Sequence, residues 1–253
     1  MGQVPGEVIA AAFAVFNPAE VVPDVARGWA LTDAATIWAA RQAGATAQLR
    51  RILGPDPAGM GRITELLEAA AEPLPLAGRP LFAGHLGLER PEGPLARFWL
   101  AADTLREYRG DSHTMVWTAA GFDPVEIGLL GDLYWGLPPR AHTGSRGWSA
   151  EQLAAGEERL RRRGLLDSDA LTPAGAAARE DVEARTDAAV APAEHLDGGR
   201  DRGVGAGLDV LACGSAVGRQ RIAVQQAPAA EPLLAGPELR RAPAAAAGVG
   251  ARR

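Results

Sequence analysis

The chain has 253 residues, enough for one or two domains with an apolar core, and its 47% hydrophobic and 23% charged content is ordinary for a globular protein. The net charge of −5 and the pI near 5.5 exclude a general electrostatic attraction to nucleic acid or anionic lipid. All 26 basic residues are arginines, which excludes lysine-based chemistry, and the single cysteine excludes an internal disulfide framework.

No membrane-directed segment is predicted. The N-terminus lacks a basic region followed by an apolar stretch, so it does not have the pattern of a signal peptide. No uncharged apolar run reaches the roughly 18 residues that a transmembrane helix needs. We therefore expect no membrane partner and a cytoplasmic location.

The first part of the chain is predicted to be a succession of helices. Asn17-Pro18 and Thr32-Asp33 have the pattern of helix starts, with a capping side chain before the first turn. The second of these helices should run to about Leu53, with Ile37 and Ile52 among its buried residues. Further helices are expected at residues 7–16, around 63–67, and at 79–88 and 95–120.

From Asp123 the pattern changes to that of a smaller unit. Asp123, Ser149 and Thr172 are predicted to cap three successive helices, the last two being separated by a short hairpin around 167–169. Gly164 should let the chain turn at the end of the second of these helices. This order of elements is that of a winged helix.

The expected fold is mainly α-helical, with a helical N-terminal part, a winged helix-turn-helix with a short β-hairpin wing, and a disordered tail. The predicted boundaries are residues 1–120, 121–192 and 193–253. The tail is rich in Gly, Ala, Pro and Arg and shows no helical or strand periodicity. A second hypothesis for it is that it arises from reading a GC-rich gene out of frame.

The winged segment resembles the MarR type of winged helix-turn-helix, in which a segment ending in "RRGL" enters the wing and an "LTPxG" step, here "LTPAG", leaves it. Residues 5–192 more specifically resemble an actinobacterial helix-turn-helix group described as SalK-like, whose biochemical activity is poorly established. The segments that carry this resemblance are "GRPLFAGHLGL" (78–88), "ADTLREYRGDSHTMVWTAAGFD" (102–123), "TGSRGWSAEQL" (143–153) and "EERLRRRGLLD" (157–167). The chain departs from the group at both ends, which leads to the hypothesis that Met1 is an internal start.

DNA binding is the first functional hypothesis, and the charge pattern weakens it. Residues 121–192 hold eight basic and twelve acidic residues, a net of −4, whereas a module that contacts phosphates usually concentrates positive charge. In the first turns of the presumed reading helix, only Gln152 is a natural base reader. The candidate DNA-contacting residues are Gln152, Arg159, Arg161, Arg162 and Arg163.

A dense polar cluster, "TLREYRGDSH", supports the alternative hypothesis of a small-molecule-binding protein or an enzyme. On a helix, Arg106, Arg109, Asp111 and His113 lie near one another at spacings of three and four residues. Such a group could hold a carboxylate or phosphate, or use the imidazole as a base. An ion-pair network joining the two parts of the chain is the competing interpretation.

No cofactor motif and no metal-ligand spacing is found, so neither a cofactor nor a metal is expected. An enzymatic activity is left open and is not the favoured interpretation. The leading hypothesis is a regulator-like winged-helix protein with a degenerate, acidic reading surface. DNA, a small anionic ligand and a second copy of the chain are its candidate partners.

Overall fold

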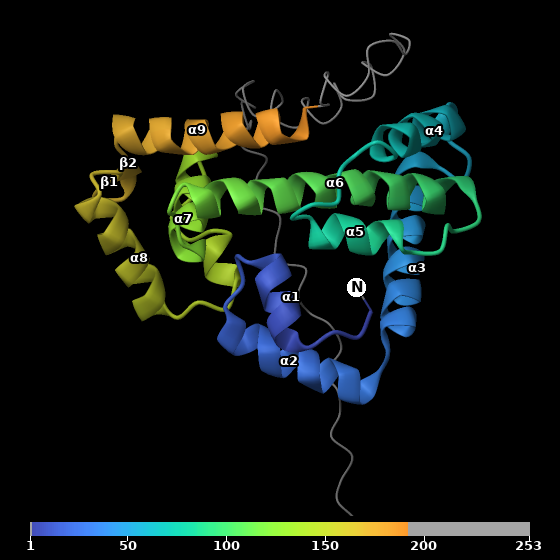
Figure 1. The fold of residues 1–253 in the computed structure, drawn as a ribbon, viewed down its shortest axis with the longest axis horizontal. Coiled ribbons are helices and arrows are strands. Elements are labelled where there is room, and N and C mark those ends of the chain that lie inside the picture. Colours follow the sequence, from blue (N-terminus) through green and yellow to red (C-terminus); the bar gives the residue numbers. More distant parts are fainter. Residues whose placement is uncertain (1, 192–253) are drawn as a thin grey trace, which may run out of the picture. The chain divides into compact units, whose positions relative to one another are not determined.

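The structure, a computed structural model, describes residues 2–191. The prediction of a mainly helical chain with a small hairpin is confirmed (Figure 1). The predictions made for residues 193–253 lie outside the described residues. The elements are α1 (Gly6–Phe13), α2 (Pro18–Leu31), α3 (Ala34–Leu53), α4 (Met60–Ala71), α5 (Pro80–Leu86), α6 (Pro94–Ala119), α7 (Pro124–Tyr134), the 3-10 turn η1 (Thr143–Ser145), α8 (Ala150–Arg162), β1 (Leu166–Asp167), β2 (Ala170–Leu171) and α9 (Pro173–Val190).

Capping side chains begin five of these helices, as the sequence predicts. Asn17 accepts the backbone N–H of Ala19 at 3.1 Å, and Asp33 accepts that of Thr36 at 2.7 Å. Reciprocal capping boxes begin α7 and α8, and Thr172 begins α9. Because each cap satisfies an otherwise unpaired N–H group, the local sequence alone determines where these helices start.

The long helix α6 connects the two halves of the described chain (Figure 1). Its first half packs against α3, α4 and α5, and α9 lies along it. One apolar cluster, which includes Phe82, Leu105 and Tyr108, lies among α4, α5 and α6. A second, which includes Leu130 and Leu160, lies among α7, α8 and α9. Since α6 contributes to both clusters, the predicted boundary at residue 120 remains a prediction.

Helices α2 and α3 contain no buried residue. The prediction that Ile37 and Ile52 are buried is therefore wrong, because they are 43% and 61% exposed. The amphipathic pattern identified a helix correctly, but α3 packs against the body mainly along α6. A single line of contact is too narrow to cover the whole apolar stripe of the helix.

The wing is a minimal hairpin in which Leu166 pairs with Leu171 and Asp167 with Ala170, antiparallel. Gly164 adopts φ +68°, the left-handed conformation that a chain reversal after a helix commonly uses. In β1, Leu166 is buried, whereas Asp167 and the turn that follows it are exposed. The predicted hairpin around residues 167–169 is confirmed.

Candidate functional site

Helix α8 has the place of the reading helix in a winged helix-turn-helix. It buries Leu153 and Leu160 against α7 and leaves the opposite face open. Gly156 permits this close crossing, since a Cβ atom there would lie 2.4 Å from a methyl carbon of Val125. The exposed residues of α8 are Ala150, Glu151, Gln152, Ala154, Ala155, Glu158 and Arg162.

Gln152, the predicted base reader, has a structural task as well. Its Oε1 atom accepts the backbone N–H of Ser149 at 2.8 Å and completes the capping box. The same oxygen lies 3.4 Å from the Nδ2 donor of Asn17. Gln152 would therefore contact a DNA base through its Nε2 atom, or its Oε1 atom would first have to release the backbone N–H of Ser149.

Two of the candidate arginines are turned back towards α7. Arg159 lies 2.5 Å from a carboxylate oxygen of Asp123 and 3.6 Å from one of Glu126. Arg163 lies 3.0 Å from Glu126 and stacks over the ring of Phe122, 4.3 Å from its centre. These contacts neutralise both guanidinium groups and join α8 to the start of α7.

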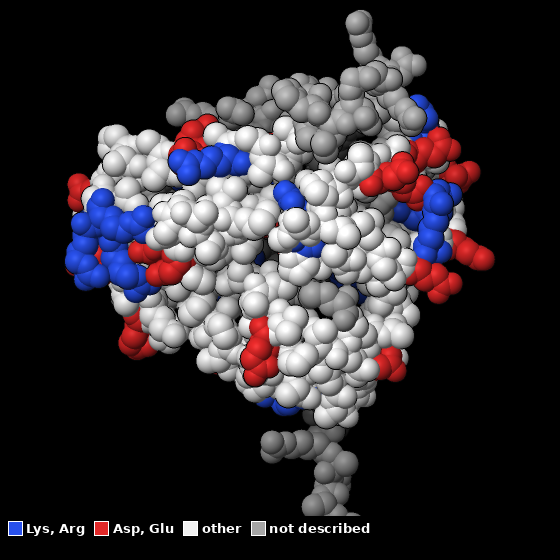
Figure 2. Space-filling view, in the orientation of Figure 1, with Lys and Arg blue, Asp and Glu red and all other residues white. Residues whose placement is uncertain are grey.

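The other two candidate arginines, Arg161 and Arg162, differ in whether they have an ion-pair partner. Arg161 donates to the backbone oxygen of Ser168 in the wing and lies 3.6 Å from Glu157. Arg162 is exposed and has no ion-pair partner among residues 2–191. Figure 2 shows the resulting basic cluster over α8, with acidic side chains at its margins. Arginine side chains thus gather on α8, although three of the four face carboxylates of the chain itself.

The four residues of the predicted ligand cluster point to three different parts of the molecule. Arg109 and His113 both face α9, where Arg109 donates to Glu183 at 2.7 Å and His113 Nδ1 lies 3.0 Å from Thr186 Oγ1. These two are brought together, as their spacing of four residues suggests.

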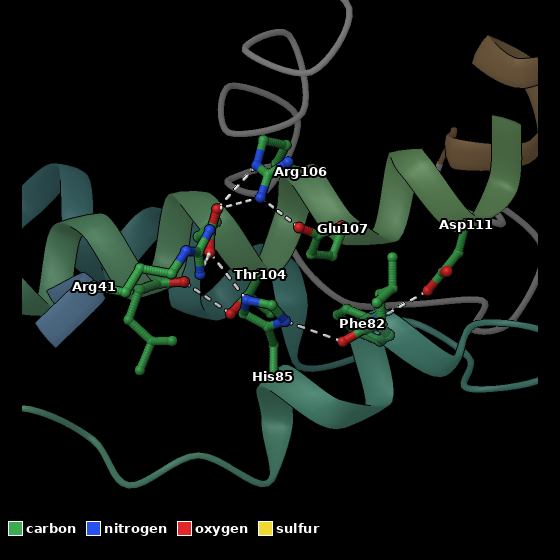
Figure 3. Close-up of polar contacts among 10 residues, drawn as sticks. Arg41, Phe82, His85, Thr104, Arg106, Glu107 and Asp111 are labelled. Carbon is green, nitrogen blue, oxygen red and sulfur yellow. Dashed lines mark hydrogen bonds and ion pairs between the residues drawn. The ribbon is translucent and has the colours of Figure 1, made fainter. Parts of the chain in front are cut away.

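Arg106 and Asp111 are directed elsewhere (Figure 3). Arg106 is hydrogen-bonded to Asp103 at 2.9 Å and pairs with Glu107. Asp111 accepts the backbone N–H of Phe82 at 2.9 Å, at the start of α5, and burial raises the pKa of this carboxyl. The contacts of Arg109, Asp111 and His113 tie α6 to α9 and α5, whereas those of Arg106 stay within α6. A shared ligand site at these four positions remains a hypothesis.

Burial lowers the pKa of His113 to about 4, helped by the positive charges of Arg179 and Arg109 and opposed by Glu183. The folded protein therefore holds this ring neutral, whereas the unfolded chain takes up a proton near pH 6.5. We expect the free energy of unfolding to fall as the pH decreases from about 6.5 towards 4, and a His113→Gln variant to lose part of this slope. Denaturant unfolding across this pH range measures it.

The comparison variant is His142→Gln, at a side chain that is 72% exposed and lies 3.6 Å from Asp132. The pH slope should change less in this variant than in His113→Gln. An unchanged slope in His113→Gln would contradict the assignment of the proton to His113.

The structure reveals a buried centre that the sequence interpretation missed, around Asp103 on α6 (Figure 3). The carboxylate of Asp103 accepts three hydrogen bonds. The donors are His85 Nε2 at 2.9 Å, Arg41 Nη1 at 2.7 Å and Arg106 Nε at 2.9 Å. Burial by itself would raise the pKa of Asp103, but the three donors outweigh it and hold the pKa well below its usual range. The available signal was the i, i+4, i+8 spacing of Asp103, Glu107 and Asp111, an acidic stripe on an otherwise apolar helix face.

The two nitrogens of His85 both face oxygen acceptors, since Nδ1 lies 3.0 Å from the backbone oxygen of Leu81 and Nε2 faces Asp103. His85, Asp103 and Glu107 also place possible metal-ligand atoms within 4.8 Å of one another. Yet Arg41 and Arg106 occupy the carboxylates, and a dication would have to displace them. The donor set fits an ion-pair cluster better than a metal centre.

A reading helix packed on a preceding helix and followed by a two-stranded wing defines a winged helix-turn-helix protein. The chain belongs to the helix-turn-helix family, whose model matches residues 1–211. No curated protein and no solved structure matches the chain. Among residues 2–191, no helix combines the length and apolarity needed to cross a bilayer.

Proposed function

We propose that the protein is a DNA-binding regulator that places α8 in the major groove. The observation that carries this proposal is the open face of α8, which bears Arg162 and lies beside the wing. The family match supports it, because helix-turn-helix proteins commonly read DNA with this helix. The basic cluster over α8 in Figure 2 supplies the positive charge for phosphate contacts.

The same geometry predicts weak binding. Arg159, Arg161 and Arg163 each lie within ion-pair distance of a carboxylate of the chain itself, so DNA would compete with existing partners. The exposed wing tip holds Asp167 and Asp169, which repel phosphates. Few unpaired positive charges therefore remain to contact the DNA phosphates. We expect a modest affinity that is limited to low ionic strength.

We further propose that the wing is of the MarR type and that the chain belongs with the SalK-like actinobacterial group. In support, Gly164 adopts the left-handed turn before the wing, and the Thr172 cap begins α9 immediately after it. A cytoplasmic location and a homodimer are part of this proposal. Paired half-sites would then mirror the symmetry of a dimer.

Replacing Arg162 with alanine should weaken binding to genomic DNA fragments and reduce the dependence of log K on log salt concentration by about 1, the loss of roughly one phosphate contact. Mobility-shift titrations between low and physiological salt measure both quantities. Arg185→Ala is the matched control, since Arg185 is 61% exposed on α9 and pairs with Asp181. The control should bind as the wild type does. Absence of any shift at low salt, or equal slopes for the two variants, would refute the proposal.

A further inference from the structure

A cavity of about 210 Å³ lies between the N-terminal helices and α5, on one side of His85. Its walls are mainly apolar and aromatic, with Trp29, Trp38, Ile37 and Phe13 among them. Among the described residues of this lining, the basic side chains are those of Arg41 and His85. An apolar cavity with a few converging polar groups is the usual form of a small-molecule site.

The guanidinium group of Arg41 is held in a defined position and is only partly used. Its Nη1 atom donates to Asp103 at 2.7 Å, and the rings of Trp38 and Trp99 flank it at 5.8 and 4.9 Å. The side chain is 43% exposed, and the remaining nitrogens of the fork have no hydrogen-bond partner among residues 2–191. A guanidinium group that uses some of its N–H donors and leaves others unpaired can still bind a carboxylate through the unpaired ones.

The charges around the cavity favour an anion. Arg41 is the arginine of its described lining, and no carboxylate of residues 2–191 lines it. The nearby acids are paired outside the cavity, since Asp103 contacts Arg41 and Arg106, and Glu107 contacts Arg106. A neighbouring cavity of about 260 Å³ shares His85 but is lined by Glu68 and Glu72 together with Arg90, which pairs with Glu68. Carboxylates thus line this cavity, whereas none of residues 2–191 brings one to the cavity beside Trp29.

We infer that the cavity beside Trp29 and Trp38 binds a small apolar molecule with one carboxylate group, held by the open edge of Arg41. The apolar body would lie against the indole rings, and the carboxylate would pair with the guanidinium group of Arg41. The volume lies below the roughly 300–1,000 Å³ of sites for drug-sized ligands, so the ligand is small. This inference concerns a surface remote from α8 and does not depend on DNA binding.

Matched pairs of probes test this inference on the full chain: benzoate, phenylacetate and hexanoate, each compared with its primary amide. The amide has the shape of the acid without its charge. We expect at least one acid to shift the indole N–H resonances of Trp29 and Trp38 and to bind roughly tenfold more tightly than its amide, as a charge-assisted hydrogen bond would produce. Nuclear magnetic resonance titration with labelled tryptophan measures both.

Two variants locate the site. Arg41→Gln should abolish the preference for the acid, and Ile37→Trp should block both acid and amide by filling the cavity while leaving the contact between Arg41 and Asp103 in place. Arg51→Gln, an exposed position on the same helix, is the control and should behave as the wild type. The inference is overturned if no acid shifts these resonances at millimolar concentration, if amides bind as tightly as acids, or if Ile37→Trp leaves binding unchanged.

Discussion

Replacing Gly175 with alanine is expected to destabilise the protein by about 3 kcal/mol, because the added methyl group has no room and forces the backbone to move. A Cβ atom at this position would lie 2.0 Å from the backbone oxygen of Leu165 and 2.9 Å from its carbonyl carbon. That oxygen also accepts the N–H of Thr172 at 3.1 Å, so displacing it breaks the closure of the wing. Chemical denaturation measures the loss, and the DNA binding that we propose should fail with it.

Gly110→Ala is the matched control for this substitution. Gly110 also lies inside a helix, but a Cβ atom there meets only Glu107 Oε2 at an ordinary 3.6 Å. The change should be neutral or stabilising by about 0.5–1 kcal/mol, because alanine is the better helix former. Equal effects at the two positions would show that the contact with Leu165 does not constrain α9.

Replacing Asp132 with alanine should also cost about 3 kcal/mol, since it leaves several buried donors without an acceptor. One oxygen of this carboxylate accepts the N–H of His142 at 3.0 Å, and the other accepts the N–H and hydroxyl of Thr143 at 3.2 and 2.7 Å. The side chain is 1% exposed. It therefore holds the connection between α7 and α8, and with it the orientation of the reading helix.

The loss in the Asp132→Ala variant can be followed by denaturation and by faster hydrogen exchange at the amides of His142 and Thr143. Asp132→Asn keeps one acceptor oxygen and should fall between the alanine variant and the wild type. Asp181→Ala removes an exposed carboxylate and should change stability by less than about 0.5 kcal/mol. A stability of Asp132→Ala equal to that of Asp181→Ala would rule out the anchoring role.

Interactions local in sequence were predictable. The caps at Asn17, Asp33, Asp123, Ser149 and Thr172 act within two or three residues, so a short stretch of sequence contains both donor and acceptor. The hairpin follows in the same way from two short apolar runs around a polar turn.

The pairing of charges was not predictable. Arg159 is separated from Asp123 by a helix and a long connection, and neither local sequence indicates that the two residues form an ion pair. His85 and Asp103 lie on different helices and meet only because α5 packs on α6. The predicted ligand cluster shows the converse, since two of its four residues contact α9, one contacts α5 and one contacts α6 itself.

By itself the sequence determined the helical class, the starts of five helices and the wing, because hydrogen bonds to nearby backbone groups and apolar periodicity act over a few residues. The arginines that remain available on α8 and the residues that converge beside His85 became evident from the packing of the helices. A charge is neutralised or left open by the groups within a few ångströms of it, and packing brings those groups together. The same packing left the apolar stripe of α3 uncovered and formed the cavity beside Arg41.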